Sequence, residues 1–522
     1  LYGCELTHYS SSEIQEFRNA VLKSEGMNIK GTHKDFAWHL IGAKCDPEFI
    51  IRAAAIDRLV REIWERLKTK THPCQEDVLT GAEICALGEA VSDHRNKFKK
   101  GVCQIMAEAL HYFKIKLVRK KEDRFHTYLH TSLGEVDLEY ATPGLVQNFL
   151  VKIYEKQSNC VIAAKMGAEV NRDTMFHTRH MKKAFTKGST SQRRRILRIL
   201  SGNIHTNDKA FKWGMQEHNK CTHDAEIDTQ MHRIWKCKGT PENKVEEVWE
   251  KYAFKTVGWP LAERAVCTID KPKRQELPEL YKYYIDDKEV EPFFFEPEDG
   301  DIFTDGSAYD MDLATAMAGA AVCQKLRNGK WKSIRWPVPA YLPQSATIAE
   351  MVGLIIALGS MRKGGIYKVV CDCSAVVSGA AKKDQPPNPK SLWGGLWKQI
   401  YSIGQGIQVE VVKVKAHRTL EQATAEGEVP WFKGNDEADM DAKMITKKYR
   451  PLEADRTLYD FQTKVAKKVL QRAISNCEAI DNAKMKDPIE GKHKKKGHTK
   501  KALGTPKQLH EFKWVGPQCF QC

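Results

Sequence analysis

Four acidic residues in the second half of the chain have the surroundings expected of ligands for divalent cations. Asp305 follows a short apolar run, Glu350 lies inside an apolar helical repeat, and Asp372 ends the run Y-K-V-V-C-D. Asp439 lies in the acidic stretch G-N-D-E-A-D-M-D-A-K. Four carboxylates brought together without a metal repel one another and raise their pKa values, so such a cluster is costly unless cations neutralise it. Their hard oxygen atoms suit Mg²⁺ rather than Zn²⁺.

Alternating and helical apolar patterns predict the elements that position these side chains. Alternation predicts strands over residues 301–308, 367–373 and 409–417, the last with His417 at its tip. Apolar residues at i, i+3 and i+4 predict a helix around Glu350. Each element points its polar residue toward one end of a sheet, so the pattern predicts an α/β fold with the acidic residues gathered there.

Five motifs occur in this region, in the order D-G-S, A-E-x(7)-L, C-D-C-S-A, K-A-H-R and G-N-D-E-A-D. Together they resemble a type 1 ribonuclease H domain over residues 301–446. The resemblance implies an α/β domain built on a five-stranded mixed sheet flanked by helices. It also implies an endonuclease that cuts the RNA strand of RNA/DNA hybrids.

The resemblance assigns a role to each ligand candidate. Two Mg²⁺ ions, for which Mn²⁺ can substitute, would activate a water and stabilise the departing 3′ oxyanion. Asp305 would bridge both ions, Glu350 and Asp372 would complete one side, and Asp439 would hold the other. His417 would assist proton movement or product release, because its pKa is close to neutrality.

The same resemblance suggests residues that contact substrate through the 2′-hydroxyl and the minor groove. In G-N-D-E-A-D the family's ligand is the last aspartate, which favours Asp439 over its neighbour Asp436. Thr347 stands where the family often has glutamine, and the nearby Gln344 is out of register. The substrate candidates are Gly306, Ser307, Thr347 and Asn435.

An insertion of about a dozen residues separates His417 from G-N-D-E-A-D. It carries Trp431 and Phe432, whose rings are suited either to stacking on bases or to packing within the domain. Packing is the favoured interpretation.

A second set of metal-ligand residue types lies in H-N-K-C-T-H-D-A-E-I-D-T-Q-M-H-R-I-W-K-C. His232 and Cys237 form one close pair, and the other is either Cys221 with His223 or His218 with Cys221. The segment resembles the C-C-H-C zinc knuckle after the thumb of non-LTR retrotransposon reverse transcriptases, although the family's C-x-x-C is missing. We expect structural Zn²⁺ on Cys221, His223, His232 and Cys237, the alternative being a buried cysteine with surface histidines.

Composition and charge divide the rest of the chain. The formal charge is +16, and residues 447–522 carry 18 basic against 8 acidic residues, which predicts a polyanionic partner. Scattered cysteines and the lack of a long apolar run predict an intracellular protein, nuclear or cytoplasmic, without a membrane segment. The expected segments are 1–125, helical and similar to a reverse transcriptase thumb and connection; 126–240, mixed, with a basic cluster at Gln192–Leu200; 241–300, a Pro-rich connector; 301–446; and 447–522, a flexible basic tail. Within this tail, Lys464–Ile474 is expected to form a basic amphipathic helix.

Two functions follow from these patterns. The first is a metal-dependent ribonuclease H within the C-terminal part of a retrotransposon-like polyprotein, acting on RNA/DNA hybrids and holding nucleic-acid backbone with the basic tail. The start L-Y-G-C-E-L looks like the middle of a domain, which favours a fragment of a longer protein. The resemblance to reverse transcriptases implies that a polymerase domain would lie upstream. The run Y-I-D-D at Tyr284–Asp287 has the letters of a polymerase palm motif but lacks its apolar flanks, so we do not expect a polymerase site there. The second function is a catalytically silent nucleic-acid-binding remnant.

Overall fold

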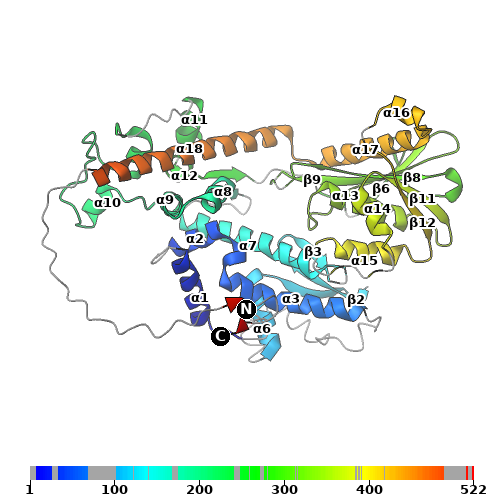
Figure 1. Ribbon diagram of the computed structural model, residues 1–522, viewed down its shortest axis with the longest axis horizontal. Coiled ribbons are helices and arrows are strands. Elements are labelled where there is room, and N and C mark those ends of the chain that lie inside the picture. Colours follow the sequence, from blue (N-terminus) through cyan, green and yellow to red (C-terminus); the bar gives the residue numbers. More distant parts are fainter. Residues whose placement is uncertain are drawn as a thin grey trace.

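The computed structural model describes most of the chain (Figure 1). The described residues are 8–25, 33–68, 101–120, 123–138, 140–166, 174–239, 247–257, 259–270, 276–278, 280–311, 313, 315–382, 385, 388, 391–416, 418–486, 513–514 and 520–521. His417 and the lysine-rich run Gly491–Lys501 lie outside them. Among the described helices, none combines the length and apolar character needed to cross a membrane.

A mixed seven-stranded sheet forms the centre of the second half of the chain. Its order is β12-β11-β8-β9-β10-β6-β7, with β8, β11 and β12 parallel and the other neighbours antiparallel. Five strands were expected, and the sheet gains two because the hairpin of the supposed connector pairs with β10. The strands are β6 (Lys282–Ile285), β7 (Lys288–Val290), β8 (Ile302–Tyr309), β9 (Met317–Lys325), β10 (Trp331–Pro337), β11 (Ile366–Cys371) and β12 (Gln408–Lys413).

Helices cover both faces of this sheet. On β8, Ile302 and Thr304 face α13, whereas Phe303 packs under α17 at Gly434, as the alternation of a strand requires. Helix α13 is buried along most of its length because α15 covers its outer side. The helices are α13 (Ala346–Gly359), α14 (Ser374–Ala380), α15 (Gly394–Ile403), α16 (Leu420–Ala425) and α17 (Val429–Tyr449).

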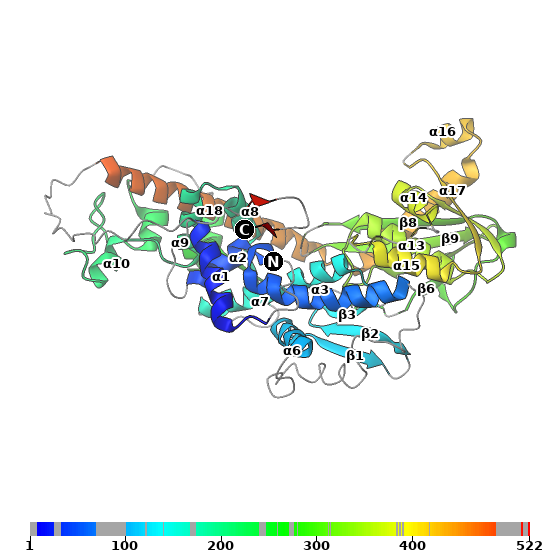
Figure 2. The same ribbon diagram turned by 60° about the horizontal axis from the view of Figure 1, so that its bottom comes forward.

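The N-terminal region is a helical body with a small sheet, not helices alone. Residues 116–120, 123–131 and 134–137 form an antiparallel three-stranded sheet (Figure 2). Leu117 and Leu129 pair in this sheet and are buried in the core. Short polar strands of this kind depend on the core beneath them, which explains why the helical expectation for 1–125 was wrong beyond Phe113. The elements are α1 (Ser11–Ser24), α2 (His33–Ile41), η2 (Ala43–Cys45), α3 (Pro47–Lys68), α6 (Gly101–Phe113), β1 (Lys116–Lys120), β2 (Asp123–Thr131), β3 (Gly134–Asp137) and α7 (Pro143–Lys165).

This body and the sheet domain share one apolar core. The Thr142 hydroxyl donates to the Ser391 carbonyl (2.8 Å). A Cβ on Gly395, at the start of α15, would lie 1.5 Å from the Tyr140 carbonyl oxygen, so the two backbones touch there. The N-terminal body is therefore packed against the α15 side of the sheet domain.

A second core is closed by a helix from the expected tail. Helix α18 (Glu453–Lys486) runs from the sheet domain to the opposite end of the molecule (Figure 1). The helix expected at Lys464–Ile474 is present within α18, and the expectation of a flexible tail was wrong for the rest of Glu453–Lys486. The stretch is ordered because the apolar stripe Val465, Val469, Leu470, Ala473 and Cys477 is buried in this core. The other elements of this region are β4 (Thr174–His177), α8 (Arg179–Lys187), α9 (Thr190–Leu200), α10 (Asn207–Lys212), η3 (His232–Lys236), α11 (Glu247–Lys251), η4 (Tyr252–Val257), α12 (Trp259–Arg264) and β5 (Cys267–Asp270), with η5 (Pro297–Asp299), β13 (Lys513–Trp514) and β14 (Phe520–Gln521) elsewhere.

The basic cluster and Y-I-D-D both have structural partners. In α9, Arg193 and Arg195 pair with Glu25 and Glu478 above a buried apolar face. The two aspartates of Y-I-D-D form the β6–β7 turn: the Asp286 carboxylate accepts from the Trp331 amide and the Asp287 carboxylate pairs with Arg335. These aspartates therefore hold the hairpin to β10.

Candidate active site and metal centres

Three elements bring three of the expected carboxylates together at one end of the sheet. Asp305 lies on β8, Asp372 directly follows β11, and Glu350 lies in the second turn of α13. β8 and β11 are parallel, with Cys371 opposite Thr304, so Asp305 and Asp372 are neighbours. Carboxylate oxygens of all three residues lie within 4.8 Å of one another. This spacing fits a shared divalent cation.

Gly306 allows α13 to approach the strand closely enough for this. A Cβ at this position would lie 2.3 Å from the Glu350 nitrogen and 2.6 Å from the Ala349 carbonyl carbon. Only glycine fits against a backbone at that distance, so the residue after Asp305 determines where Glu350 lies. The sequence suggested Gly306 as a substrate contact, and the structure gives it a packing role.

Burial and mutual repulsion alter the acidity of the group. Asp305 and Glu350 are only 5% and 6% exposed. Burial, followed by the charges of Asp372 and Asp439, raises the pKa of Asp305 to about 7. Burial, followed by the charge of Asp305, raises the pKa of Glu350 well above its ordinary value. Without a cation the site therefore retains protons near neutral pH, and a divalent ion would replace them.

The fourth carboxylate stands beside this group. Asp439 on α17 is half-buried and acts electrostatically on Asp305, whereas its rival Asp436 is exposed. Its Oδ2 accepts a hydrogen bond from Lys443 Nζ, one helical turn on, at 2.5 Å. In the described parts of the chain, the group whose carboxylate oxygens lie within 4.8 Å of one another is Asp305, Glu350 and Asp372, without Asp439. The structure thus gives it a cationic partner that the sequence motif did not suggest, although Asp-x-x-x-Lys spacing on a helix is the signal for such a pair.

The remaining substrate candidates lie on β8, α13 and α17, the elements that carry Asp305, Glu350 and Asp439. Ser307, Thr347 and Asn435 are half-buried. Asn435 Oδ1 is buried and has no hydrogen-bond partner within the described parts of the chain, so this oxygen is not open to substrate in the structure. Gln344 is used elsewhere: its Oε1 accepts from the Ala318 amide, and its Nε2 donates to the Val338 and Pro339 carbonyls.

The insertion contributes packing more than an open surface. Trp431 donates from Nε1 to Asp301 Oδ2 (2.7 Å) and packs against the small core around Phe303. The first part of the insertion lies in α16, and Arg418, which precedes this helix, pairs with Glu426 and Glu428, which follow it.

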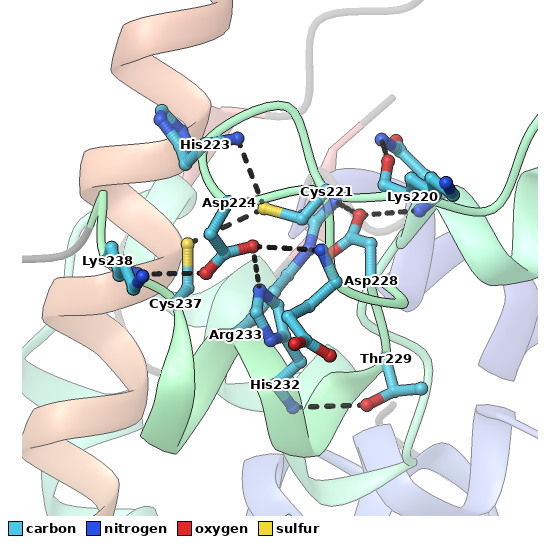
Figure 3. A network of polar contacts seen from close by, with 12 residues as sticks. Lys220, Cys221, His223, Asp224, Asp228, Thr229, His232, Arg233, Cys237 and Lys238 are labelled. Carbon is cyan, nitrogen blue, oxygen red and sulfur yellow. Dashed lines mark hydrogen bonds and ion pairs between the residues drawn. The ribbon is translucent and has the colours of Figure 1, made fainter.

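A second group of ligand types lies at the far end of the molecule. Ligand atoms of Cys221, Asp224, His232 and Cys237 all lie within 4.8 Å of one another (Figure 3). The two sulfur atoms are 3.6 Å apart, close to the roughly 3.8 Å expected for two thiolates at 2.3 Å from one tetrahedral ion. His232 Nε2 lies 3.1 Å from Asp224 Oδ1 without the geometry of a hydrogen bond, as two ligands of a common ion would.

The expected ligand His223 is not in this group, and Asp224 takes its place. The His223 ring points away from the sulfur atoms (Figure 3) and lies against Gly239, where a Cβ would come within 2.4 Å of it. The alternative ligand His218 is exposed and is also outside the group. Cys221 and Asp224 have the two-residue spacing of the family's C-x-x-C, so the signal was present with an aspartate in place of the second cysteine.

Helix α18 supports this second centre. Arg472 and Asn476 donate to the Ile234 carbonyl, in the helical turn between His232 and Cys237. Ile480 packs against both cysteines. Burial raises the pKa of Cys237 to about 11, so the thiolate form needs a nearby cation.

Neither the models of known protein families nor the curated proteins include one that matches this chain.

Proposed function

We propose that this protein is a divalent-metal-dependent endonuclease that cuts the RNA strand of RNA/DNA hybrids, as part of retrotransposon-like reverse transcription. The observation that carries the proposal is the convergence of Asp305, Glu350 and Asp372 within 4.8 Å. These are the first three carboxylates of the ribonuclease H motifs. The first and the last of them, Asp305 and Asp372, are separated by about 70 residues of sequence. The mixed α/β domain around them agrees with the expected fold class.

The donor set fits hard divalent ions. Asp305, Glu350 and Asp372 would hold one Mg²⁺ or Mn²⁺, and Asp439 would extend the site to a second. When bound, the ions supply an activated water and neutralise charge at the departing 3′ oxygen. The chain's own contribution is to bury the carboxylates and to hold Glu350 against β8 through Gly306.

The test uses the full chain with a labelled RNA/DNA hybrid and Mg²⁺, compared with Asp305→Asn and with the exposed-site control Asp436→Asn. We expect cleavage of the RNA strand by wild type and by the control, and none by Asp305→Asn. Binding without cleavage in wild type would instead support the rival function, a silent nucleic-acid-binding remnant.

We also propose that Cys221, Asp224, His232 and Cys237 hold a structural Zn²⁺. Two sulfur, one nitrogen and one oxygen ligand make a closed tetrahedral set, which is typical of structural rather than catalytic zinc. The matched substitutions are Asp224→Ala and His223→Ala. We expect near-stoichiometric zinc in wild type and in His223→Ala, and its loss in Asp224→Ala, measured by elemental analysis of purified protein. Loss in His223→Ala with retention in Asp224→Ala would contradict the ligand assignment.

A further inference from the structure

Lys443 lies at the edge of the carboxylate centre. It extends from α17 one turn after Asp439, and its ammonium donates to Asp439 Oδ2 at 2.5 Å. The lysine side chain is 47% exposed and the aspartate side chain 32%, so the pair is open to solvent at the edge of the centre. An exposed ion pair of this kind adds little to the stability of the fold. Its position beside the carboxylate centre therefore points to a role at that centre.

The Lys443 ammonium also interacts electrostatically with Asp305, one of the three clustered carboxylates (Asp305, Glu350 and Asp372, the main group). Asp305 and the Tyr309 hydroxyl on β8 lie close enough to interact with Lys443. Asp439 in turn acts on Asp305. Lys443 is therefore the cation beside the fourth carboxylate, whereas Asp305, Glu350 and Asp372 lie together as a group suited to a divalent ion.

Charge balance shows what this contact does. Four ionised carboxylates carry four negative charges, and Lys443 offsets one of them. One divalent ion at the main group leaves the centre with a single negative charge, and a second ion would make it positive. A phosphate from the substrate restores neutrality, so the second ion is favoured only when the phosphate arrives or the ammonium leaves.

We propose that Lys443 is a positioning residue that occupies the second cation position at Asp439 until substrate binds, and that it then moves to a phosphate oxygen of the nucleic acid. This inference rests on the proposed function for the identity of the substrate. A lysine suits the role because its ammonium is a compact charge on a flexible stem that can exchange a carboxylate for a phosphate. The divalent ions then bind in order, the first without substrate and the second with it.

The test measures Mn²⁺ binding to the full chain without nucleic acid, by electron paramagnetic resonance of free Mn²⁺. The variants are Lys443→Met, Lys443→Arg and the control Lys447→Met, which removes an exposed lysine one turn further along the same helix. We expect Lys443→Met to bind the second ion about fivefold more tightly than wild type. Lys443→Arg and Lys447→Met should keep the wild-type isotherm. Comparing variants cancels any Mn²⁺ bound elsewhere, and coincident isotherms for Lys443→Met and wild type overturn the inference.

Hybrid cleavage separates this inference from the proposed function. In Lys443→Met the Mg²⁺ concentration that half-saturates cleavage should fall, while in Lys447→Met it should not. If wild type cuts no hybrid but the Mn²⁺ isotherms differ as expected, the ribonuclease proposal fails and the role of Lys443 at Asp439 stands. If wild type cuts the hybrid and the isotherms coincide, the role of Lys443 fails and the ribonuclease proposal stands.

Discussion

The two candidate metal centres are built in opposite ways. The carboxylate centre takes its residues from β8, α13, the end of β11 and α17, and its Asp439 side remains partly open to solvent. The cysteine-containing centre takes all four ligand types from residues 221–237 and is closed by Ile480 of α18. An open centre assembled by long-range contacts leaves room for substrate, whereas a closed local centre stabilises a fold. The comparison predicts that substitutions at the first affect chemistry and those at the second affect stability.

The largest effect is expected from Glu350→Gln, which keeps the shape of the side chain and removes its charge. Hybrid cleavage should fall by more than about 100-fold, because even residues behind a metal ligand cost 10- to 100-fold. The unfolding midpoint without metal should stay the same or rise, since one repelling carboxylate is gone. Unaltered cleavage would remove Glu350 from the site. The measurements are single-turnover cleavage and thermal unfolding.

Cys237→Ser should show the reverse behaviour. Loss of the sulfur ligand should release zinc and lower the unfolding free energy by about 3 kcal/mol, because metal binding in such sites contributes directly to folding. Cleavage per folded molecule should change less than about threefold. Chemical unfolding with and without a chelator gives the first quantity. A loss of cleavage as large as that of Glu350→Gln, with unchanged stability, would reverse the assignment of the two centres.

Gly306→Ala lies between these two cases. The added methyl would meet the α13 backbone 2.3 Å away, so we expect a loss of about 1–3 kcal/mol in unfolding free energy from overpacking. The same shift moves Glu350 away from Asp305, so cleavage should fall together with stability. Gly359→Ala, at the exposed end of α13, is the control, because a Cβ there would meet no atom within 4 Å and its φ is not positive. Full cleavage by Gly306→Ala would show that α13 can move without disturbing the centre.

The smallest effect is a pH dependence of stability in the metal-free protein. Asp305 has a raised pKa, so the folded state binds more protons than the unfolded state between about pH 4 and pH 7. Stability is therefore greatest at the acidic end of this window and is lost as pH rises through 7, by on the order of 2 kcal/mol. Asp305→Asn should make this decline shallower without removing it, because the pKa of Glu350 is raised as well, and saturating Mg²⁺ should abolish it. A wild-type profile that rises over the same window would contradict the burial of this carboxylate.

The elements that carry the carboxylates could be predicted from the sequence because strong local patterns specify them. The alternation before Asp305 and the helical repeat around Glu350 correspond to β8 and α13. The β6–β7 hairpin was missed because its short strands, K-Y-Y-I and K-E-V, carry no clear alternation and depend on pairing with β10. These strands are specified by a neighbour and not by their own residues.

Two further features, the length of α18 and the identity of one zinc ligand, also could not be predicted from the sequence. The periodicity of residues 464–474 predicted a helix, but its length depends on a core supplied by α8, α9 and α12 far earlier in the chain. At the cysteine centre, the sequence prediction considered only cysteine and histidine as zinc ligands, so Asp224 was missed. The backbone of the turn, with Ala225 in the left-handed region at φ 58°, decides which of the two side chains faces the sulfur atoms.

The late position of α18 has a consequence for synthesis on the ribosome. The sheet domain is contiguous from Lys282 to Tyr449, so it can form as soon as that stretch has emerged. The core of α8, α9 and α12 is complete only when residues 459–477 arrive, nearly 200 residues after α12. Until then its apolar surface stays open to solvent, which makes this core the part of the nascent chain most dependent on protection from aggregation.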